Sequence, residues 1–298
     1  MAKFAKAEKQ AAKAIREKLA IASSRHGNRN SGKIHSIGTA RSYAAALTKV
    51  TVWMKDCRFD HGLAKLTPAE AWRFLADQAV SVKQSTLDQY RQAVECHLGV
   101  KFERIHSERE TVLDGRAYTV EQTKAIAEAQ MGHNAIATDI ASQAGLRAHE
   151  LHTIRPIEEQ HPSPHRTWAE NLFAGRENWE RYTVVGKGGL IREVRLSPEL
   201  SGRLEAIRLA EPVTVRDRDI FYEKHYSIGG GNAWSKSVTV ASKEVLGFSN
   251  GAHGFRHSYA QDRMDDYQSM GFSYQEALAN VAQELGHFSP HTTEVYLR

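Results

Sequence analysis

The chain has 298 residues and a mass of 33.4 kDa, a length typical of two domains. Hydrophobic residues make up 41% and charged residues 25% of it, with a mean hydropathy of -0.52, which excludes a disordered or fibrous protein. The sequence has only two cysteines, which excludes a disulfide scaffold. It has neither an apolar signal core nor an apolar run of about 18 residues, which excludes a signal peptide and a membrane-spanning helix. We therefore expect a cytoplasmic protein.

Positive charge is concentrated at the N-terminus. Residues 1–33 contain nine Lys and Arg against two Glu, a net charge of +7, and the remaining 31 basic and 33 acidic residues leave -2. A basic segment ahead of a near-neutral body favours a nucleic-acid partner, because Lys and Arg that neutralise phosphates release counterions. The alternative is a solvated, Ala-rich helix whose charge serves solubility. The residues expected to contact DNA are Lys3, Lys6, Lys9, Lys13, Arg16, Lys18, Lys83 and Arg91.

The first half is predicted to be a basic arm with a linker, 1–38, followed by a helical domain, 39–100. Apolar residues at helical spacing predict a first helix over 39–57. Thr67, Pro68 and Glu70 predict the start of a second helix through an N-cap, a proline at the first position and an acid at N3. A third helix follows Gln84. The polar, non-periodic stretch 101–118 is predicted to link two domains.

The second half, 119–298, is predicted to mix helices with a small antiparallel sheet. Thr119 with Gln122 caps one helix, and Gly145 ends another that covers 136–144. Two strands flank the glycine-rich turn 186–189 as a hairpin. Further helices are expected from Ser197–Pro198, near 233–246, 254–267 and 273–285, and from Pro290 onward. The fold class is mainly α with a small antiparallel β-sheet (α+β).

Four segments of the second half carry candidate chemistry. In chain order they are Gly-Leu-Arg-Ala-His-Glu-Leu at 145–151, Gly-Lys-Gly at 186–188, His-Gly-Phe-Arg-His at 253–257, and Leu-Gly-His at 285–287 followed by Tyr296. Their order and spacing resemble the tyrosine recombinase (phage integrase) family, in which the tyrosine follows the last histidine by nine residues, as Tyr296 follows His287. The resemblance covers 119–298 by motif, and 39–100 only as a helical bundle of the size of the family's core-binding domain.

The resemblance implies a site-specific DNA recombinase that cleaves and rejoins strands through a 3′-phosphotyrosine and a four-way junction. Phosphoryl transfer is catalysed mainly by positioning and by cations that stabilise charge on the equatorial oxygens, which suits two arginines. Neither a metal nor a cofactor is implied. The implied catalytic residues are Arg147, Lys187, His253, Arg256, His287 and the nucleophile Tyr296, with Glu150 and His257 in support.

Each residue has an implied role. Arg147 and Arg256 hold phosphate oxygens through planar guanidinium groups, and His287 adds a hydrogen bond. Tyr296 attacks phosphorus. Lys187 protonates the 5′ oxygen, while His253 assists proton transfer at the tyrosine. Glu150 orients a neighbouring cation, and His257 supports Arg256.

The resemblance also implies partners. These are double-stranded DNA recombination sites, a homotetramer on two duplexes, accessory DNA-bending or directionality proteins, and a nucleoid-associated location. We expect the integrase of a prophage or other mobile element. Because the sequence stops two residues after Tyr296, we expect the tail that many members pack onto a neighbouring protomer to be absent or very short.

Other interpretations stay open. Within the same chemistry the protein could be a chromosome-dimer resolvase, an invertase or a relaxing topoisomerase, and outside it a DNA-binding protein that has lost activity. His253 and His257 stand four residues apart, a spacing that suits zinc in a metallohydrolase, but HExxH and a third placed ligand are lacking. Residues 155–181 are rich in His, Pro and Trp, and we expect an insertion with its own contacts.

Overall fold

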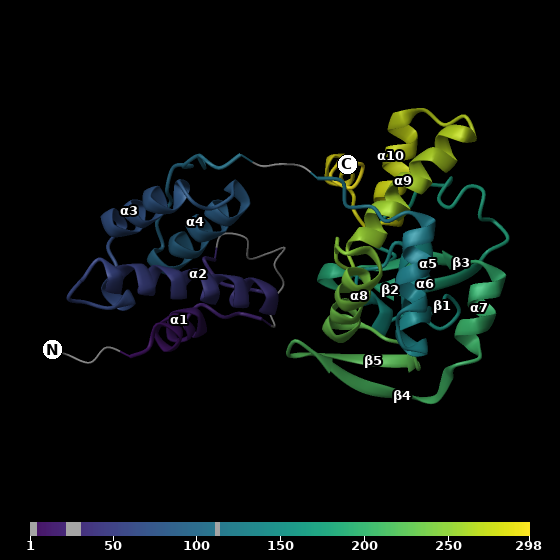
Figure 1. Cartoon of the computed structure of the whole chain (residues 1–298), viewed down its shortest axis with the longest axis horizontal. Coiled ribbons are helices and arrows are strands. Elements are labelled where there is room, and N and C mark those ends of the chain that lie inside the picture. The colour runs from purple at the N-terminus through teal and green to yellow at the C-terminus, as the bar shows by residue number, and fades with distance from the viewer. Residues whose placement is uncertain (1–4, 22–30, 111–113) are drawn as a thin grey trace. The chain divides into compact units, whose positions relative to one another are not determined.

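The structure is a computed structural model that describes residues 5–21, 31–110 and 114–298. The chain divides into two compact units, Met1–Val112 and Leu113–Arg298. Figure 1 labels their helices and strands. Of the residues expected to bind DNA, Lys3 lies outside the described residues.

The first unit is helical. Its elements are α1 (Ala7–Arg16), α2 (Ile37–Asp56), the 3-10 helix η1 (Leu63–Lys65), α3 (Pro68–Ala79) and α4 (Gln84–Leu98). The predicted start of α3 is confirmed, because Thr67 and Glu70 form a reciprocal capping box ahead of Pro68. Leu47, Val50 and Phe74 lie in the shared core.

Residues 7–16 differ from the expected arm. They form α1, which packs against α2 and buries Ala11, Ala14 and Ile15 in the core of the first unit. The Gln10 side chain also accepts a hydrogen bond from the Leu63 backbone N–H at 2.9 Å. Because the apolar residues of α1 share one face, the helix gains more from burial than from remaining solvated. Its basic residues nevertheless face outward.

The stretch expected to be a linker is partly packed. Phe102 and Ile105 lie against the core of the first unit, and the Gln84 side chain bonds the backbone of Ile105 and Ser107. Tyr118, at the other end, is buried in the core of the second unit.

The second unit joins helices to two small antiparallel sheets. Its helices are α5 (Val120–Glu128), α6 (Gly132–Ala144), η2 (Glu150–His152), η3 (Lys187–Gly189), α7 (Pro198–Glu205), α8 (Gly231–Leu246), α9 (Gly254–Ser269), α10 (Tyr274–Glu284) and α11 (Pro290–Glu294). Its strands are β1 (Arg155–Pro156), β2 (Glu180–Val185), β3 (Ile191–Leu196), β4 (Arg208–Asp217) and β5 (Ile220–Tyr226). The mainly helical α+β class is confirmed.

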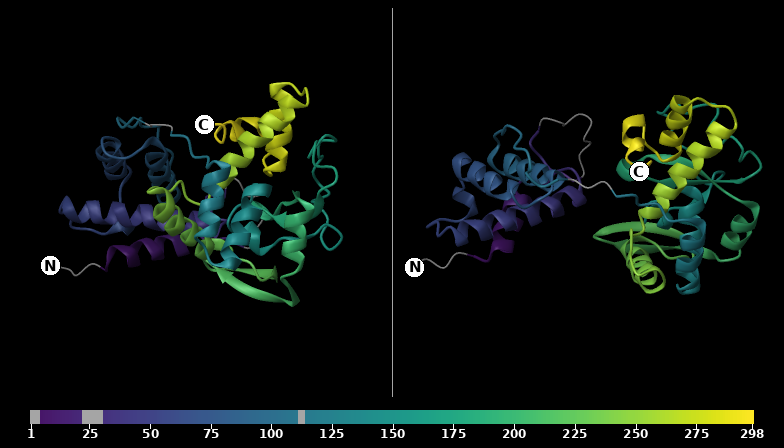
Figure 2. Two further views of the ribbon diagram at one scale, coloured as in Figure 1. Left: turned by 45° about the vertical axis from the view of Figure 1, so that its right-hand side comes forward. Right: turned by 45° about the horizontal axis from the view of Figure 1, so that its top comes forward.

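The packing of these elements positions the candidate site. One sheet has the order β1-β2-β3, and α6 packs against both β3 and α9. Helices α9 and α10 lie side by side (Figure 1). The second sheet, the β4–β5 hairpin, lies along one edge of the unit (Figure 2) and is an element that the sequence analysis did not predict. In the described part of the chain, no helix is long and apolar enough to cross a membrane.

Candidate active site

The end of α6 carries the first candidate residue. Gly145 ends the helix at φ 59°, and a Cβ there would lie 2.6 Å from the Tyr259 ring, so glycine is required for both the conformation and the space. The chain then turns back so that Arg147 lies beside Glu150. The Gly145 carbonyl accepts a hydrogen bond from Arg256 Nη1 at 2.5 Å. The α6 terminus thus brings two arginines from distant segments together.

Glu150 is the fully buried centre of a cluster of three arginines. Its Oε1 lies 2.7 Å from Arg147 Nη1, and its Oε2 lies 2.9 Å from Arg192 Nη2 and 4.0 Å from Arg256 Nη1. Burial raises the pKa of this carboxyl, but the charges of Arg192, Arg256 and Arg147 outweigh it and hold the pKa well below the ordinary value. Glu150 is therefore ionised and holds the Arg147 and Arg192 guanidinium groups through ion pairs.

Backbone carbonyls at the end of α10 hold two of these arginines. Arg256 is completely buried on α9 and donates through Nη2 to the Leu285 carbonyl. Arg192 Nη1 donates to the Glu284 carbonyl at 2.5 Å. A helix C-terminus carries partial negative charge and unpaired carbonyls, so it suits cations. Burial, together with Arg147, lowers the pKa of Arg256 to about 10, and it remains charged at neutral pH.

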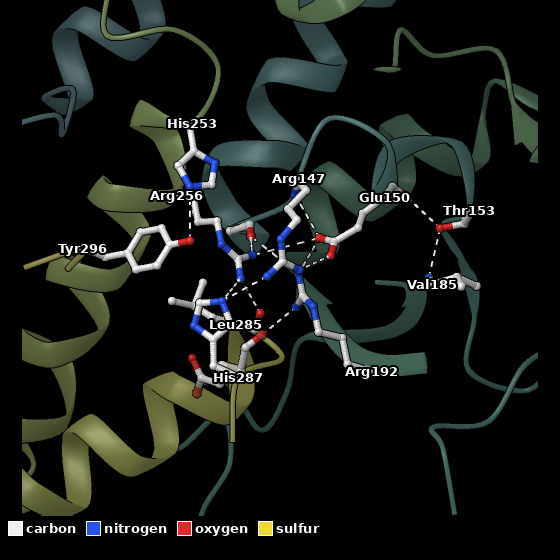
Figure 3. A network of polar contacts seen from close by, with 12 residues as sticks. Arg147, Glu150, Thr153, Val185, Arg192, His253, Arg256, Leu285, His287 and Tyr296 are labelled. Carbon is white, nitrogen blue, oxygen red and sulfur yellow. Dashed lines mark hydrogen bonds and ion pairs between the residues drawn. The ribbon is translucent and has the colours of Figure 1, made fainter. Parts of the chain in front are cut away.

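His287 bridges the two predicted catalytic arginines (Figure 3). Its Nε2 lies 3.0 Å from Arg147 Nη2 and 3.3 Å from Arg256 Nη2. Arginine only donates hydrogen bonds, so Nε2 is an acceptor and the ring proton belongs on Nδ1. Burial and the charges of Arg256 and Arg147 lower the pKa of His287 to about 3. The imidazole is therefore neutral.

Tyr296 points toward this cluster from the short segment after α11 (Figure 3). Its side chain is buried, its hydroxyl lies 3.1 Å from His253 Nε2, and the Arg256 guanidinium carbon lies 5.5 Å from its ring centroid. The His257 ring centroid is 4.8 Å from that of Tyr296, so His257 packs against the nucleophile candidate. Desolvation, with Arg256 nearby, lowers the pKa of His253 to about 4, which leaves a neutral imidazole able to accept the phenolic proton.

Lys187 is placed beside the cluster without joining it. It begins the exposed turn between β2 and β3, and no hydrogen bond or ion pair to it is found among the described residues. The preceding residue, Gly186, lies close to the site: a Cβ there would be 3.2 Å from Glu150 Oε1 and 3.7 Å from Arg147 Nη1. The backbone of the turn thus starts against the arginine cluster.

Arg192 is the site residue that the sequence analysis missed. Along β3 the buried positions alternate, and Arg192 shares the inward face with Val194 and Leu196. An arginine in phase with two core residues is a recognisable signal, because a charged group on the buried face of a strand needs a partner. That partner is Glu150.

A second buried carboxylate stabilises the α9–α10 pair behind the site. Glu284 accepts hydrogen bonds from the Tyr259 hydroxyl at 2.7 Å, the Tyr267 hydroxyl at 2.6 Å and Arg263 Nε at 3.0 Å. Its carboxylate is fully satisfied, while its backbone carbonyl holds Arg192. Glu284 thereby links the core to the arginine cluster.

The described residues expected to bind DNA differ in exposure and in their contacts within the first unit. Arg91 is engaged within the first unit, 2.9 Å from Glu95 and 3.7 Å from Asp88. Lys18 is partly buried. The others are exposed: Lys6, Lys9, Lys13, Arg16 and Lys83.

The histidine pair considered for zinc lies beside Tyr296. The ring centroids of His253 and His257 are 5.8 Å apart in an edge-on arrangement. Among residues 5–21, 31–110 and 114–298, no group of three or more His, Cys, Asp or Glu side chains is placed to hold a metal ion. The pair therefore lacks a third ligand in the described structure.

Comparison with solved structures gives the fold. The chain is similar to XerH site-specific recombinase bound to a palindromic difH substrate, with a TM-score of 0.57 and 16% identity over 98% of this chain and 93% of that chain. It is similar to a lambda integrase dimer bound to a COC′ core site, with a TM-score of 0.53 and 15% identity over 88% of this chain and 71% of that chain.

A third structure, the Tn1549 transposon integrase in complex with transposon right end DNA, gives a TM-score of 0.51 at 11% identity over 99% of this chain and 95% of that chain. No family model and no curated protein matches the sequence. The chain has the fold of tyrosine recombinases, and the resemblance seen in the motifs is confirmed at the level of the fold.

Proposed function

We propose that this protein is a site-specific DNA recombinase that cleaves and rejoins strands through Tyr296. The observation that carries the proposal is the position of the Tyr296 hydroxyl, which lies 3.1 Å from a neutral His253 while its ring faces the buried Arg256. A nucleophile next to a base, beside fixed cations, is the arrangement that phosphoryl transfer needs.

Arg147 and Arg256 would bind the scissile phosphate. Glu150 holds Arg147, and the Gly145 and Leu285 carbonyls hold Arg256, so neither guanidinium has to reorganise when charge develops on the equatorial oxygens. A bound phosphodiester adds a negative charge next to His287. That charge favours protonation of the imidazole, which allows Nε2 to donate to a phosphate oxygen.

The chemical step transfers the phosphoryl group to the tyrosine. The Tyr296 oxygen attacks phosphorus, its proton passes to His253 Nε2, and the bond to the 5′ oxygen breaks. Lys187 donates a proton to that oxygen, which leaves as a 5′ hydroxyl. The product is a 3′-phosphotyrosyl link that conserves the phosphodiester energy, and attack by the 5′ hydroxyl of a partner duplex reverses the step.

The first unit would bind the duplex through α1. Ala11, Ala14 and Ile15 are buried on one face, and helical geometry places the exposed basic residues on the opposite face. Those residues are Lys6, Lys9, Lys13 and Arg16. They offer a row of cations to DNA phosphates, together with Lys83, the residue directly before α4.

The assembly and biological role belong to the same proposal. Two of the similar structures are integrases and all three are DNA complexes, which supports a double-stranded DNA substrate and a role in moving a prophage or other mobile element. The reaction would run in a homotetramer on two duplexes, with accessory DNA-bending or directionality proteins. An inactive DNA-binding protein of the same fold is the alternative that the following test separates.

The test is covalent capture. Wild type and Tyr296→Phe are each incubated with DNA from the flanks of the gene and denatured, and protein joined to DNA is identified by its tyrosyl peptide. Phenylalanine keeps the ring packing on His257 and loses only the hydroxyl. Tyr274→Phe, which alters an exposed tyrosine on α10, is the matched control.

An adduct from wild type and Tyr274→Phe, but none from Tyr296→Phe, is expected, and sequencing the attached strand would give the cleavage site. An adduct from Tyr296→Phe would refute the assignment of the nucleophile. Tight, salt-sensitive binding by wild type without any adduct, even on nicked DNA that traps the intermediate, would favour the inactive binder.

A further inference from the structure

The segment between β1 and β2 reaches the base of the Lys187 turn. Ser163 is buried and exchanges two hydrogen bonds with Ile191, the first residue of β3: the Ser163 N–H donates to the Ile191 carbonyl, and the Ile191 N–H donates to Ser163 Oγ, each at 3.0 Å. Ile191 lies four residues after Lys187. Ser163 therefore fixes the strand on which the lysine turn returns to the sheet.

The same segment contacts the residue that follows His287. The Trp168 ring centroid lies 5.3 Å from that of Phe288, and the Arg166 guanidinium carbon lies 4.7 Å from the Phe288 centroid. Next along the segment, the Ala169 N–H donates to Gln283 Oε1 on α10 at 2.8 Å. Two side chains of the segment thus contact Phe288, which is 40% exposed and directly follows the histidine that bridges the arginines.

A strained residue anchors the far end. Phe173 is buried with φ at 61°, a left-handed conformation that costs a bulky residue energy, and its N–H donates to the buried Glu284 Oε1 at 3.0 Å. The Arg195 guanidinium carbon lies 5.2 Å from its ring. The surroundings hold Phe173 in this conformation, so the segment is fixed to both β3 and α10.

We propose that residues 163–173 form a strap that positions Lys187 relative to His287. This rests on the proposed function, in which the first protonates the leaving oxygen and the second contacts the phosphate. Ser163 is the positioning residue on the lysine side, and Trp168 is the positioning residue on the histidine side. The strap lies within 155–181, the stretch expected to be an insertion with its own contacts, and the proposal gives part of that stretch a role in the reaction.

The lysine turn needs such a restraint. Gly186, Gly188 and Gly189 surround Lys187, and the last two have φ near 80°, so the turn is rich in residues with wide backbone freedom. Its own backbone hydrogen bonds are Gly186 N–H to the Leu190 carbonyl at 2.7 Å and Gly189 N–H to the Gly186 carbonyl at 3.2 Å. A general acid acts only within hydrogen-bond reach of the oxygen it protonates, and a displacement of about 1 Å can cost roughly 100-fold in rate. The two hydrogen bonds of Ser163 add a restraint at the base of the turn, on the edge of β3 that does not face β2.

The first experiment measures the turn itself. Amide hydrogen exchange of residues 186–191 is compared in full-length wild type, Ser163→Ala, Ser163→Thr and Glu170→Ala. Glu170, exposed on the same segment, is the matched control. Faster exchange of this peptide in Ser163→Ala, with wild-type exchange in Ser163→Thr and Glu170→Ala, is expected because threonine keeps the acceptor oxygen. Equal exchange in Ser163→Ala and wild type would overturn the strap.

The second experiment separates positioning of the acid from general damage. Cleavage is timed on nicked duplexes carrying the site recovered by covalent capture, with either the natural 5′ oxygen or a 5′ bridging sulfur at the scissile phosphate. A thiolate leaves without a proton, so it does not need Lys187. Ser163→Ala should lose about 10- to 100-fold in rate with oxygen and approach wild type with sulfur.

The histidine side of the strap should give a different pattern in the same assay. Trp168→Ala should slow cleavage of both substrates to a similar extent, because His287 acts on the phosphate whichever atom leaves. A Ser163→Ala defect of equal size on both substrates would contradict positioning of the acid and leave a structural role alone. If wild type forms no adduct at all, the proposed function fails, and the strap has no reaction in which to position Lys187. If wild type forms the adduct and Ser163→Ala cleaves at the wild-type rate, the strap alone is refuted.

Discussion

Replacing Glu150 by Gln should sharply destabilise the second unit. The side chain keeps its shape but loses the charge that neutralises three guanidinium groups, two of them within 3 Å of its oxygens and one at 4.0 Å. Arg192 and Arg256 are almost completely buried, so their charges would be left without a counterion. Removing one partner of a buried ion pair costs about 3–5 kcal/mol of unfolding free energy.

Calorimetry would measure this loss of unfolding free energy as a lower melting temperature. In a unit of this size each kcal/mol lowers the melting temperature by about 2–4 °C, so the transition of the second unit should fall by about 6–20 °C. The matched control is Glu128→Gln, because Glu128 lies 3.9 Å from Lys124 with both side chains well exposed. Such a pair contributes about 0–1 kcal/mol, and its loss should barely move the transition.

The pH dependence of the unfolding free energy provides a second test of Glu150→Gln. Burial raises the pKa of Glu150, but the three arginines lower it well below 4.5, so the folded state gains stability above the ordinary carboxyl pKa and loses it as the pH falls below that value. Wild type and Glu150→Gln should therefore converge in acid. A difference below about 1 kcal/mol at pH 7, or one that does not shrink in acid, would refute the view that Glu150 neutralises the cluster.

Three other perturbations test separate parts of the molecule. The pKa of His287 is lowered to about 3, so between about pH 6.5 and pH 3 the unfolded state binds a proton that the folded state does not, and the unfolding free energy should fall as the pH drops through this range. Urea titrations of His287→Gln should show a shallower fall of unfolding free energy with pH. The same pH dependence in wild type and variant would contradict this. Gly145→Ala should cost at least about 1–3 kcal/mol in chemical unfolding because of φ 59° and the approach to Tyr259, and an unaltered midpoint would show that neither matters. Lys9→Gln with Lys13→Gln should reduce the salt dependence of DNA affinity by about 1.8 in log-log slope, and an unchanged slope would place DNA on another surface.

Elements with local end signals could be predicted from the sequence. The capping box of Thr67 and Glu70 marks the start of α3, and Gly145 marks the end of α6, because caps satisfy backbone groups with residues only a few positions away. Lys187 was likewise placed on the turn of a hairpin by its glycines. These features depend on short-range chemistry that the sequence displays directly.

The β4–β5 hairpin could not be predicted in the same way. Arg218 and Asp219 form its turn with φ of 49° and 66°, where Asn and Gly are the usual residues. Pro212 interrupts β4 next to a register shift between Arg208 and Val213, and most of the strand is exposed. Neither a turn signal nor an alternating apolar pattern was therefore present.

The motif residues of the site were predicted, but the contacts among them were not. Glu150 was expected to orient a single neighbouring cation, whereas it faces three arginines from three segments. Arg192 comes from a strand that carries no family motif. The long-range packing of α6, β3 and α9 brings the three arginines to Glu150, and this packing cannot be predicted from the spacing of the residues along the chain.

The carbonyls that hold the buried arginines have a consequence for mutational tolerance. Gly145 and Leu285 accept from Arg256, and Glu284 accepts from Arg192, all through main-chain oxygens. A substitution at Leu285 changes the side chain but keeps the backbone carbonyl that accepts from Arg256 at the end of α10. Broad mutagenesis should therefore find that Leu285 accepts other apolar residues of similar volume, while Arg256 accepts none. The geometry of the cations can in this way persist while the side chains around them diverge.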